Sequence, residues 1–152
     1  MCSLYSKKAT SSDYELILQL WERSVTATHD FLQPDDLKEI REEIPAYLPL
    51  LDVQLWYVDD HLVGFSSVHE QHLEMLFLDS DALGMGYGTQ IMQRLIHGGV
   101  TSVDVNKDNP RATSFYLKHG FRIISESPTD SAGRAYPILH LSRFVSDITA
   151  IL

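Results

Sequence analysis

The feature that most constrains this chain is a run of alternating glycines, Gly84, Gly86 and Gly88, between a buried strand and an amphipathic helix. The strand, at residues 71–78, ends in four apolar residues, so it is predicted to lie at the centre of a sheet with both faces covered. Glycines permit a tight turn, whose free backbone N–H groups add to those of the helix N-terminus to form an anion site. The alternative is a flexible turn without a ligand. The segment therefore predicts a binding site for a pyrophosphate group.

Two common phosphate-binding patterns do not fit this segment. A nucleotide P-loop requires Gly-Lys followed by Ser or Thr, and the segment has no lysine. A dinucleotide fingerprint requires another glycine three residues after Gly86, where Thr89 stands. The chain that follows Thr89 is also too short for a full doubly wound domain, so a dinucleotide-dependent oxidoreductase is disfavoured.

The hydrophobic periodicity predicts eleven elements in the order β-α-α-β-β-β-α-β-α-β-β. A capping box of Ser12 and Glu15 is expected to start the first helix, and Pro45 to end or kink the second, which begins at Pro34. Asn109 is expected to cap the last helix. The predicted strands cover residues 4–9, 53–58, 62–68, 71–78, 100–105, 121–126 and 135–143. We interpret residues 1–152 as a single α/β (α+β) domain.

Composition excludes several classes of protein. The 152 residues include 12 basic and 21 acidic side chains, a net charge of −9, so no basic stripe is available for nucleic acid. No apolar run is long enough for a membrane span. Cys2 is the only cysteine, so no intramolecular disulfide can form, and the histidines lack zinc-site spacing. We expect a cytoplasmic protein without a metal or a membrane partner, and with a mild preference for cationic partners.

Two motifs resemble those of the GNAT superfamily of N-acyltransferases. Residues 83–88, Leu-Gly-Met-Gly-Tyr-Gly, are similar to its pyrophosphate motif Gln/Arg-x-x-Gly-x-Gly/Ala, and residues 109–121 resemble its Asn-x-x-Ala…Tyr…Gly-Phe segment. Residues 27–32 and 136–137 look like a bacterial subgroup of small acetyltransferases. The resemblance covers essentially the whole chain. It implies a mixed, mostly antiparallel central sheet flanked by helices, with acetyl-CoA as cosubstrate and an amine as acceptor.

The resemblance also implies which residues contact the coenzyme. Backbone groups of the central strand would pair with the pantetheine arm and polarise the thioester carbonyl. Leu83 stands where the family has Gln or Arg, so the backbone amides would carry the phosphates and somewhat weaker binding is expected. The expected coenzyme-binding residues are Leu76, Phe77, Leu78, Leu83, Gly84, Met85, Gly86, Tyr87, Gly88, Thr89, Asn109, Ala112 and Tyr116.

A base is useful because an acceptor amine such as lysine enters protonated, and deprotonation at pH 7 costs about 4.6 kcal/mol. His72 and Glu74 lie on one face of the central strand, at the two positions where the family often has its base. Both could equally be polar residues of a sheet edge. His29 is a third candidate, at the end of the first helix, where a helix C-terminal cation is the competing interpretation. The choice among the three stays open.

Tyr116 is the candidate acid, because its hydroxyl can donate a proton to the departing thiolate. A core aromatic residue is the alternative interpretation of Tyr116. His29 and Phe31 are expected to line the acceptor pocket.

The resulting hypothesis is an acetyl-CoA-dependent N-acetyltransferase acting on a primary amine of a protein or a small molecule, as a monomer or homodimer. A catalytically silent, coenzyme A-binding sensor or partner-binding module is the alternative.

Overall fold

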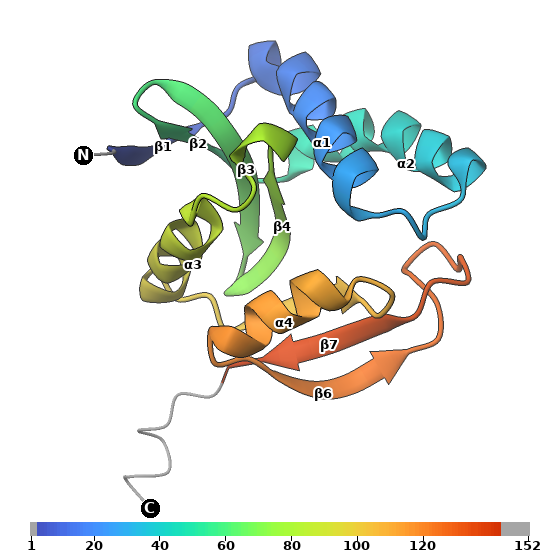
Figure 1. Cartoon of the computed structure of the whole chain (residues 1–152). Helices are drawn as coiled ribbons and strands as arrows, with labels where there is room; N and C mark the ends of the chain where they lie inside the picture. Colours follow the sequence, from blue (N-terminus) through green and yellow to red (C-terminus); the bar gives the residue numbers. More distant parts are fainter. Residues whose placement is uncertain (1–2, 144–152) are drawn as a thin grey trace, which may run out of the picture.

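The computed structural model describes residues 3–143 and confirms the predicted order of helices and strands (Figure 1). No helix in this described part is long and apolar enough to cross a membrane. The elements are β1 (Leu4–Lys8), α1 (Tyr14–Thr28), α2 (Pro34–Tyr47), β2 (Val53–Val58), β3 (His61–His69), β4 (His72–Leu78), α3 (Tyr87–His97), β5 (Ser102–Asn106), α4 (Pro110–Lys118), β6 (Arg122–Ser127) and β7 (Ile138–Ser142).

The strands form one seven-stranded sheet in the order β1-β2-β3-β4-β5-β7-β6. Every neighbouring pair is antiparallel except β4 and β5, which run parallel. The strand before the glycines, β4, is the fourth of the seven, so its predicted central position is confirmed. The expected mixed, mostly antiparallel sheet is likewise confirmed.

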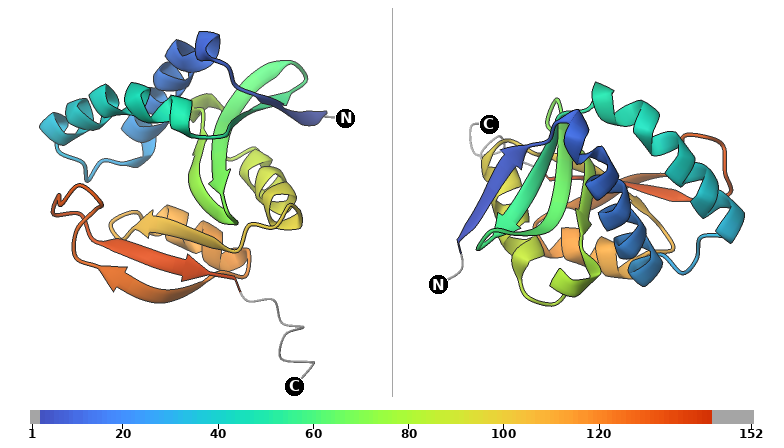
Figure 2. Two further views of the ribbon diagram at one scale, coloured as in Figure 1. Left: turned by 180° about the vertical axis from the view of Figure 1, so that it is seen from behind. Right: turned by 90° about the horizontal axis from the view of Figure 1, so that it is seen from above.

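The four helices pack in two pairs against the sheet (Figure 2). Helices α1 and α2 pack against β2 and β3 on one face, where Ile17 and Leu20 meet Leu55 and Phe65. Helices α3 and α4 contribute to two further clusters, in which Ile91 packs with Trp56, and Met92 and Tyr116 pack with residues of β5 and β7. The apolar stripes predicted for α1, α3 and α4 therefore contribute buried residues to the core, whereas α2 has no buried residue and its stripe of Leu37, Ile40 and Ile44 is half-buried against the α1 cluster.

Two helix ends differ from the sequence prediction. The capping box is formed two residues earlier, at the 3-10 turn Ser11–Asp13, where the Asp13 carboxylate accepts a hydrogen bond from the Thr10 backbone N–H at 2.8 Å, and α1 begins at Tyr14. Pro45 does not end α2, which continues to Tyr47. A proline near the end of a helix removes one hydrogen bond. The helix nevertheless continues past Pro45, and after Tyr47 the chain passes directly into a 3-10 turn at Leu48–Leu50.

The parallel pair β4 and β5 separates after only two register positions. His72 pairs with Ser102 and Leu73 with Val103, and no further pairing joins the two strands. Beyond this point β4 follows β3 while β5 follows β7, and the strands diverge in the middle of the sheet (Figure 2). The divergence leaves backbone N–H and C=O groups along both inner edges without a sheet partner, and these groups need partners from elsewhere.

Candidate functional site

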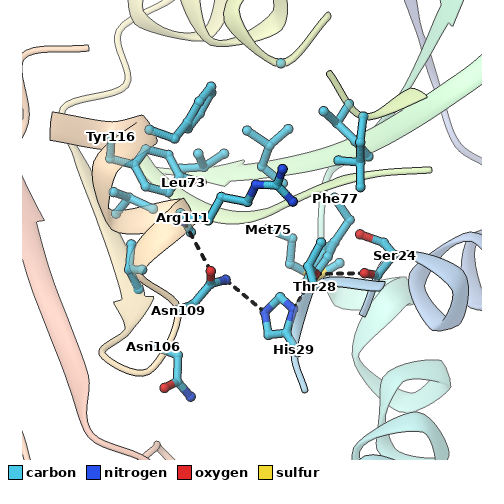
Figure 3. A pocket seen from close by; sticks show the side chains of 18 of the residues that line it. Ser24, Thr28, His29, Leu73, Met75, Phe77, Asn106, Asn109, Arg111 and Tyr116 are labelled. Atoms are coloured by element: carbon cyan, nitrogen blue, oxygen red, sulfur yellow. Dashed lines mark hydrogen bonds between the residues drawn. The ribbon is translucent and has the colours of Figure 1, made fainter. Parts of the chain in front are cut away.

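A cavity of about 400 Å³ occupies the divergence between β4 and β5. Its wall comes from the end of α1, residues of β4 and β5, the glycine loop, and α4 (Figure 3). Of the coenzyme-binding residues expected from the sequence, Met85 and Tyr87 do not line it. The others do, namely Leu76, Phe77, Leu78, Leu83, Gly84, Gly86, Gly88, Thr89, Asn109, Ala112 and Tyr116.

The glycine loop has the local geometry of an anion-binding site. Gly84 and Gly86 have φ angles of 78° and 82°, in the region that side chains rarely adopt, and a Cβ at either position would meet nothing within 4 Å. Gly86 is the N-cap of α3, so the first backbone N–H groups of that helix have no partner within it. Gly88 instead serves packing, because a Cβ there would lie 3.2 Å from Leu78 and 3.4 Å from Phe115. The loop thus offers open space beside free amides.

An ion pair fixes the chain at the entrance to this loop. Arg23 of α1 donates from Nε and Nη2 to the two carboxylate oxygens of Asp79, at 3.0 and 2.8 Å. This guanidinium lowers the pKa of Asp79, which directly follows β4. The Asp79 backbone also pairs with β3, its N–H donating to the carbonyl of Val63. Helix α1 and the sheet therefore hold the first residue of the connection to the glycine loop.

His29 lies in the cavity wall between α1 and α4 (Figure 3). Its Nδ1 is 2.6 Å from the Thr28 hydroxyl, and its Nε2 is 3.5 Å from the amide nitrogen of Asn109. The ring packs against Phe31 and Phe77 at centroid distances of 5.2 and 6.3 Å. Burial lowers the pKa of His29, opposed by the nearby Asp30 carboxylate. This environment therefore disfavours the protonated imidazole that the helix C-terminal interpretation of His29 requires.

Tyr116 lies on the opposite wall, on α4, with only 7% of its surface exposed. Its ring packs edge-on against Phe115 and Phe121, at 5.1 and 5.8 Å. Burial raises the pKa of Tyr116 well above its ordinary value, so the hydroxyl stays protonated throughout the physiological range. The residue is thus both a core aromatic and a neutral hydrogen-bond donor at the cavity, and the two interpretations are compatible.

The two candidate bases on β4 have different surroundings. Glu74 lines the cavity, whereas His72 does not. The His72 ring spans two residues of β5, with Nδ1 2.7 Å from the Ser102 hydroxyl and Nε2 3.4 Å from the Asp104 carboxylate. Asp104 itself lines the cavity and is also bonded to His140 Nδ1 at 2.6 Å. Any influence of His72 on the cavity would therefore pass through Asp104.

Phe31, expected to line the acceptor pocket, packs on the His29 ring and connects it to a further aromatic residue. Its ring is 6.3 Å from that of Tyr136, in the connection between β6 and β7. The Tyr136 hydroxyl donates to the Asp36 carboxylate of α2 and accepts from the Gln33 backbone N–H at 3.0 Å. Phe31 does not itself line the cavity. The two residues expected to line the acceptor pocket therefore differ in position. His29 is part of the cavity wall, whereas Phe31 packs against the His29 ring outside the cavity lining.

Several wall residues were not identified from the sequence, among them Ser24, Thr28, Asp104, Asn106 and Arg111. Thr28 directly precedes a candidate residue, and a hydroxyl next to a histidine was an available signal. Asp104 and Asn106 alternate with buried valines along β5, which also could have placed them on one face. Asp104 and Asn106 line the cavity only because β4 diverges from β5, and the sequence pattern gives no signal of this divergence.

Comparison with known proteins gives consistent matches. The family model described as "Acetyltransferase (GNAT) family" matches residues 14–121. The peptidyl-lysine N-acetyltransferase YjaB of Salmonella typhimurium is 34% identical over 140 residues, which cover 89% of this chain and 94% of YjaB. The solution structure of apo-form YjaB from Escherichia coli superposes with a TM-score of 0.85 at 30% identity, covering 92% of this chain and 97% of that one. The PaiA N-acetyltransferase of Thermoplasma acidophilum, solved with coenzyme A, has the same fold, with a TM-score of 0.63 at 18% identity over 93% of this chain and 99% of that one.

Proposed function

Because the chain belongs to the acetyltransferase (GNAT) family, we propose that its acceptor is the side-chain amine of a lysine in a protein. The chain is an acetyl-CoA-dependent N-acetyltransferase, which transfers the acetyl group to an amine. The relatives named peptidyl-lysine N-acetyltransferase support a lysine acceptor, since they align along nearly the whole chain. The single cysteine, which is typical of proteins in reducing compartments, supports a cytoplasmic location.

The cavity fits the coenzyme. The open space beside Gly84 and Gly86 suits the pyrophosphate, which would accept hydrogen bonds from the first amides of α3. The unpaired inner edges of β4 and β5 suit the amide groups of the pantetheine arm. Acetyl-CoA supplies the acetyl thioester to this cavity. The polar groups that the sheet leaves unpaired thus correspond to those that an extended amide chain requires.

Tyr116 is the proposed acid, and its placement is the observation that carries the mechanism. In the reaction the amine nitrogen attacks the thioester carbonyl carbon, and the bond from that carbon to sulfur breaks. The acceptor ammonium first gives one proton to a base in the cavity wall. As the amide forms, the nitrogen loses its second proton to solvent, and the leaving sulfur takes a proton from the Tyr116 hydroxyl, which solvent then restores. Burial keeps this hydroxyl protonated, because the raised pKa of Tyr116 disfavours the phenolate.

The proposed acceptor is tested by thiol release from acetyl-CoA with matched amines. We expect release with a lysine-bearing peptide whose N-terminus is blocked, and mass spectrometry should locate the new acetyl group on the lysine side chain. A lysine-free peptide with a free N-terminus and a polyamine are the competing acceptors. Faster release with either one would overturn the lysine assignment. Binding of acetyl-CoA without release on any amine would identify a silent coenzyme-binding module instead.

Replacing Tyr116 with Phe tests the proposed acid. The kcat of the Tyr116→Phe variant is expected to fall about 100-fold, the lower range for loss of a proton-transfer group. Acetyl-CoA affinity by calorimetry and the melting temperature should stay close to wild type, since the ring keeps its packing. Tyr47→Phe, at a 57% exposed position on α2, is the matched control. A Tyr116→Phe variant with wild-type turnover would remove Tyr116 from the mechanism.

A further inference from the structure

Three side chains in the cavity wall could accept the proton of the acceptor amine, namely Glu74, Asp104 and His29. The side chain of Asp104 is 46% exposed and already accepts a 2.6 Å hydrogen bond from His140. Glu74 is exposed on β4. His29 differs from both because its ring is packed between Phe31 and Phe77, while its two nitrogens have defined partners. The directions of these hydrogen bonds determine which nitrogen carries the proton.

The hydrogen on Nδ1 follows from the position of Thr28. The Thr28 hydroxyl donates its single hydrogen to the backbone carbonyl of Ser24, one turn earlier in α1, at 2.7 Å. Its oxygen can therefore only accept in the 2.6 Å contact with His29. The Nδ1 atom must be the donor in that contact, so it carries a hydrogen.

The free lone pair on Nε2 follows from the position of Asn109. The side-chain oxygen of Asn109 accepts from the Ala112 backbone N–H at 3.2 Å, which caps α4 and fixes the orientation of the amide. The amide NH₂ group therefore faces His29 Nε2, at 3.5 Å. A hydrogen on Nε2 would point at this NH₂ group, so Nε2 presents its lone pair. The distance makes this a weak contact that an entering amine could replace.

We infer that His29 Nε2 accepts the proton of the acceptor ammonium, and that Thr28 and Asn109 are positioning residues that hold the imidazole in the required tautomer. In this step one N–H bond of the ammonium breaks and the proton moves to Nε2, which leaves the amine lone pair free to attack. The imidazolium later releases this proton to solvent. The inference rests on the proposed function, because it specifies the base of the same reaction.

Kinetics of variants at these positions test the inference. With saturating lysine peptide, kcat of His29→Gln is expected to fall about 100-fold. Thr28→Val removes the acceptor for Nδ1–H while keeping the shape of the side chain, and we expect kcat to fall about tenfold with little change in acetyl-CoA affinity. Thr28→Ser restores a hydroxyl and should recover most of the rate. Asn109 is less suitable for such a test, since its replacement would also remove the cap of α4.

The pH profile distinguishes loss of the base from a merely structural defect. The lowered pKa of His29 means that the ring becomes neutral, and activity rises, at a pH below the ordinary imidazole value of about 6.5. His29→Gln should abolish this rise of kcat/KM with pH, which is the acid limb of the profile. Besides the neighbouring Asp30, the other charged or titratable groups that share the cavity wall with His29 are Glu74, Asp104, Arg111 and Tyr116. Glu74→Gln and Asp104→Asn should therefore retain the limb.

His119→Gln is the matched control. Burial also lowers the pKa of His119, with a contribution from Arg143, but His119 does not line this cavity. The inference is overturned if His29→Gln keeps a turnover within twofold of wild type, or keeps the acid limb. Such a result would leave the proposed function intact, provided that wild-type protein acetylates the peptide and the Tyr116→Phe variant does so much more slowly. Failure of the proposed function would appear instead as absence of thiol release by the wild-type protein.

Discussion

At the scale of single residues, the three glycines of the loop meet two different requirements. Gly84 and Gly86 supply positive φ angles and Gly88 supplies a close contact with α4 and β4. Leu83 lines the same cavity with an apolar side chain and adds no polar group. The loop therefore offers backbone amides for anion binding, and position 83 is where a side-chain donor could be added.

Leu83→Gln is expected to tighten coenzyme binding. A side-chain amide at this position could donate one more hydrogen bond to a phosphate oxygen, worth about 1 kcal/mol, or roughly fivefold in Kd. Calorimetry with acetyl-CoA measures the change. Leu83→Met, which keeps an apolar side chain of similar size, serves as the control. Equal affinities of the Gln variant, the Met variant and wild type would show that position 83 does not reach the phosphates.

At the scale of elements, α2 and the connection between β6 and β7 are joined beside the acceptor end of the cavity. Arg134 of this connection donates to carboxylates of α2, at 2.9 Å to Glu39 and 3.1 Å to Glu43, and to Asp130 at 3.2 Å. The Arg134 side chain is only 12% exposed, whereas its Glu39 and Glu43 partners are 59% and 39% exposed, so water reaches these ion pairs from the side of α2. Tyr136, two residues later, is bonded to Asp36 of the same helix. The connection is thus fixed to α2 at two points.

Arg134→Met should loosen this junction. Removal of the guanidinium leaves several carboxylates without a counter-charge, and we expect a loss of about 2 kcal/mol in unfolding free energy. The KM for the lysine peptide should rise more than acetyl-CoA affinity changes, because the coenzyme is proposed to bind at the glycine loop. Denaturant titration and steady-state kinetics measure both effects. Arg122→Met, at an exposed position on β6, is the control. A larger change in acetyl-CoA affinity than in peptide KM would argue against separate binding regions for the peptide and the coenzyme.

At the scale of the whole molecule, the net charge of −9 favours an encounter with a cationic acceptor and opposes an anionic coenzyme. The acidic side chains of α2 lie on the proposed acceptor side, next to Tyr136. The glycine loop counters the unfavourable charge locally with oriented amides. Under the proposed function, long-range electrostatics favour the cationic acceptor, and short-range hydrogen bonds from the glycine loop would hold the coenzyme.

Ionic strength is expected to affect the two substrates differently. With increasing salt, the KM for a lysine peptide with basic flanking residues should rise about threefold, because screening weakens its attraction to the acidic surface. The KM for acetyl-CoA should stay constant or fall over the same range. A peptide with uncharged flanking residues is the control, and steady-state kinetics at several salt concentrations give the comparison. A salt-independent KM for the basic peptide would mean that the acidic surface does not guide the acceptor.

The local elements were predictable because each depends on neighbours in the chain. The alternation of apolar residues predicted β2 and β3, the glycine spacing predicted the loop before α3, and Asn109 was correctly predicted as a cap. The capping box at Ser12 was wrong because two overlapping patterns compete there. The carboxylate of Asp13 reaches back to Thr10 and takes the role assigned to Glu15.

The candidate site was only partly predictable, since a residue's role depends on where other elements place it. His72 and Glu74 look equivalent on the strand, yet Glu74 lines the cavity and His72 is bonded to Ser102. His29 has the sequence position of a helix-end cation, but Phe31 and Phe77 bury its ring. Burial is a property of the packed molecule, so the charge state of His29 could not be derived from its neighbours in the sequence.

The sequence by itself determined the order of the elements, the glycine loop and the family resemblance, because periodicity, turn residues and helix caps act over a few residues. The tertiary structure alone decided where β4 and β5 part and which side chains face the resulting cavity. It also brought Thr28, His29 and Asn109 together across α1 and α4. The contact between His29 and Asn109 joins residues 80 positions apart and exists only once the sheet has assembled, so the lone pair that we infer at Nε2 depends on the tertiary structure. The Thr28 contact from which we infer the hydrogen on Nδ1 is local to the end of α1.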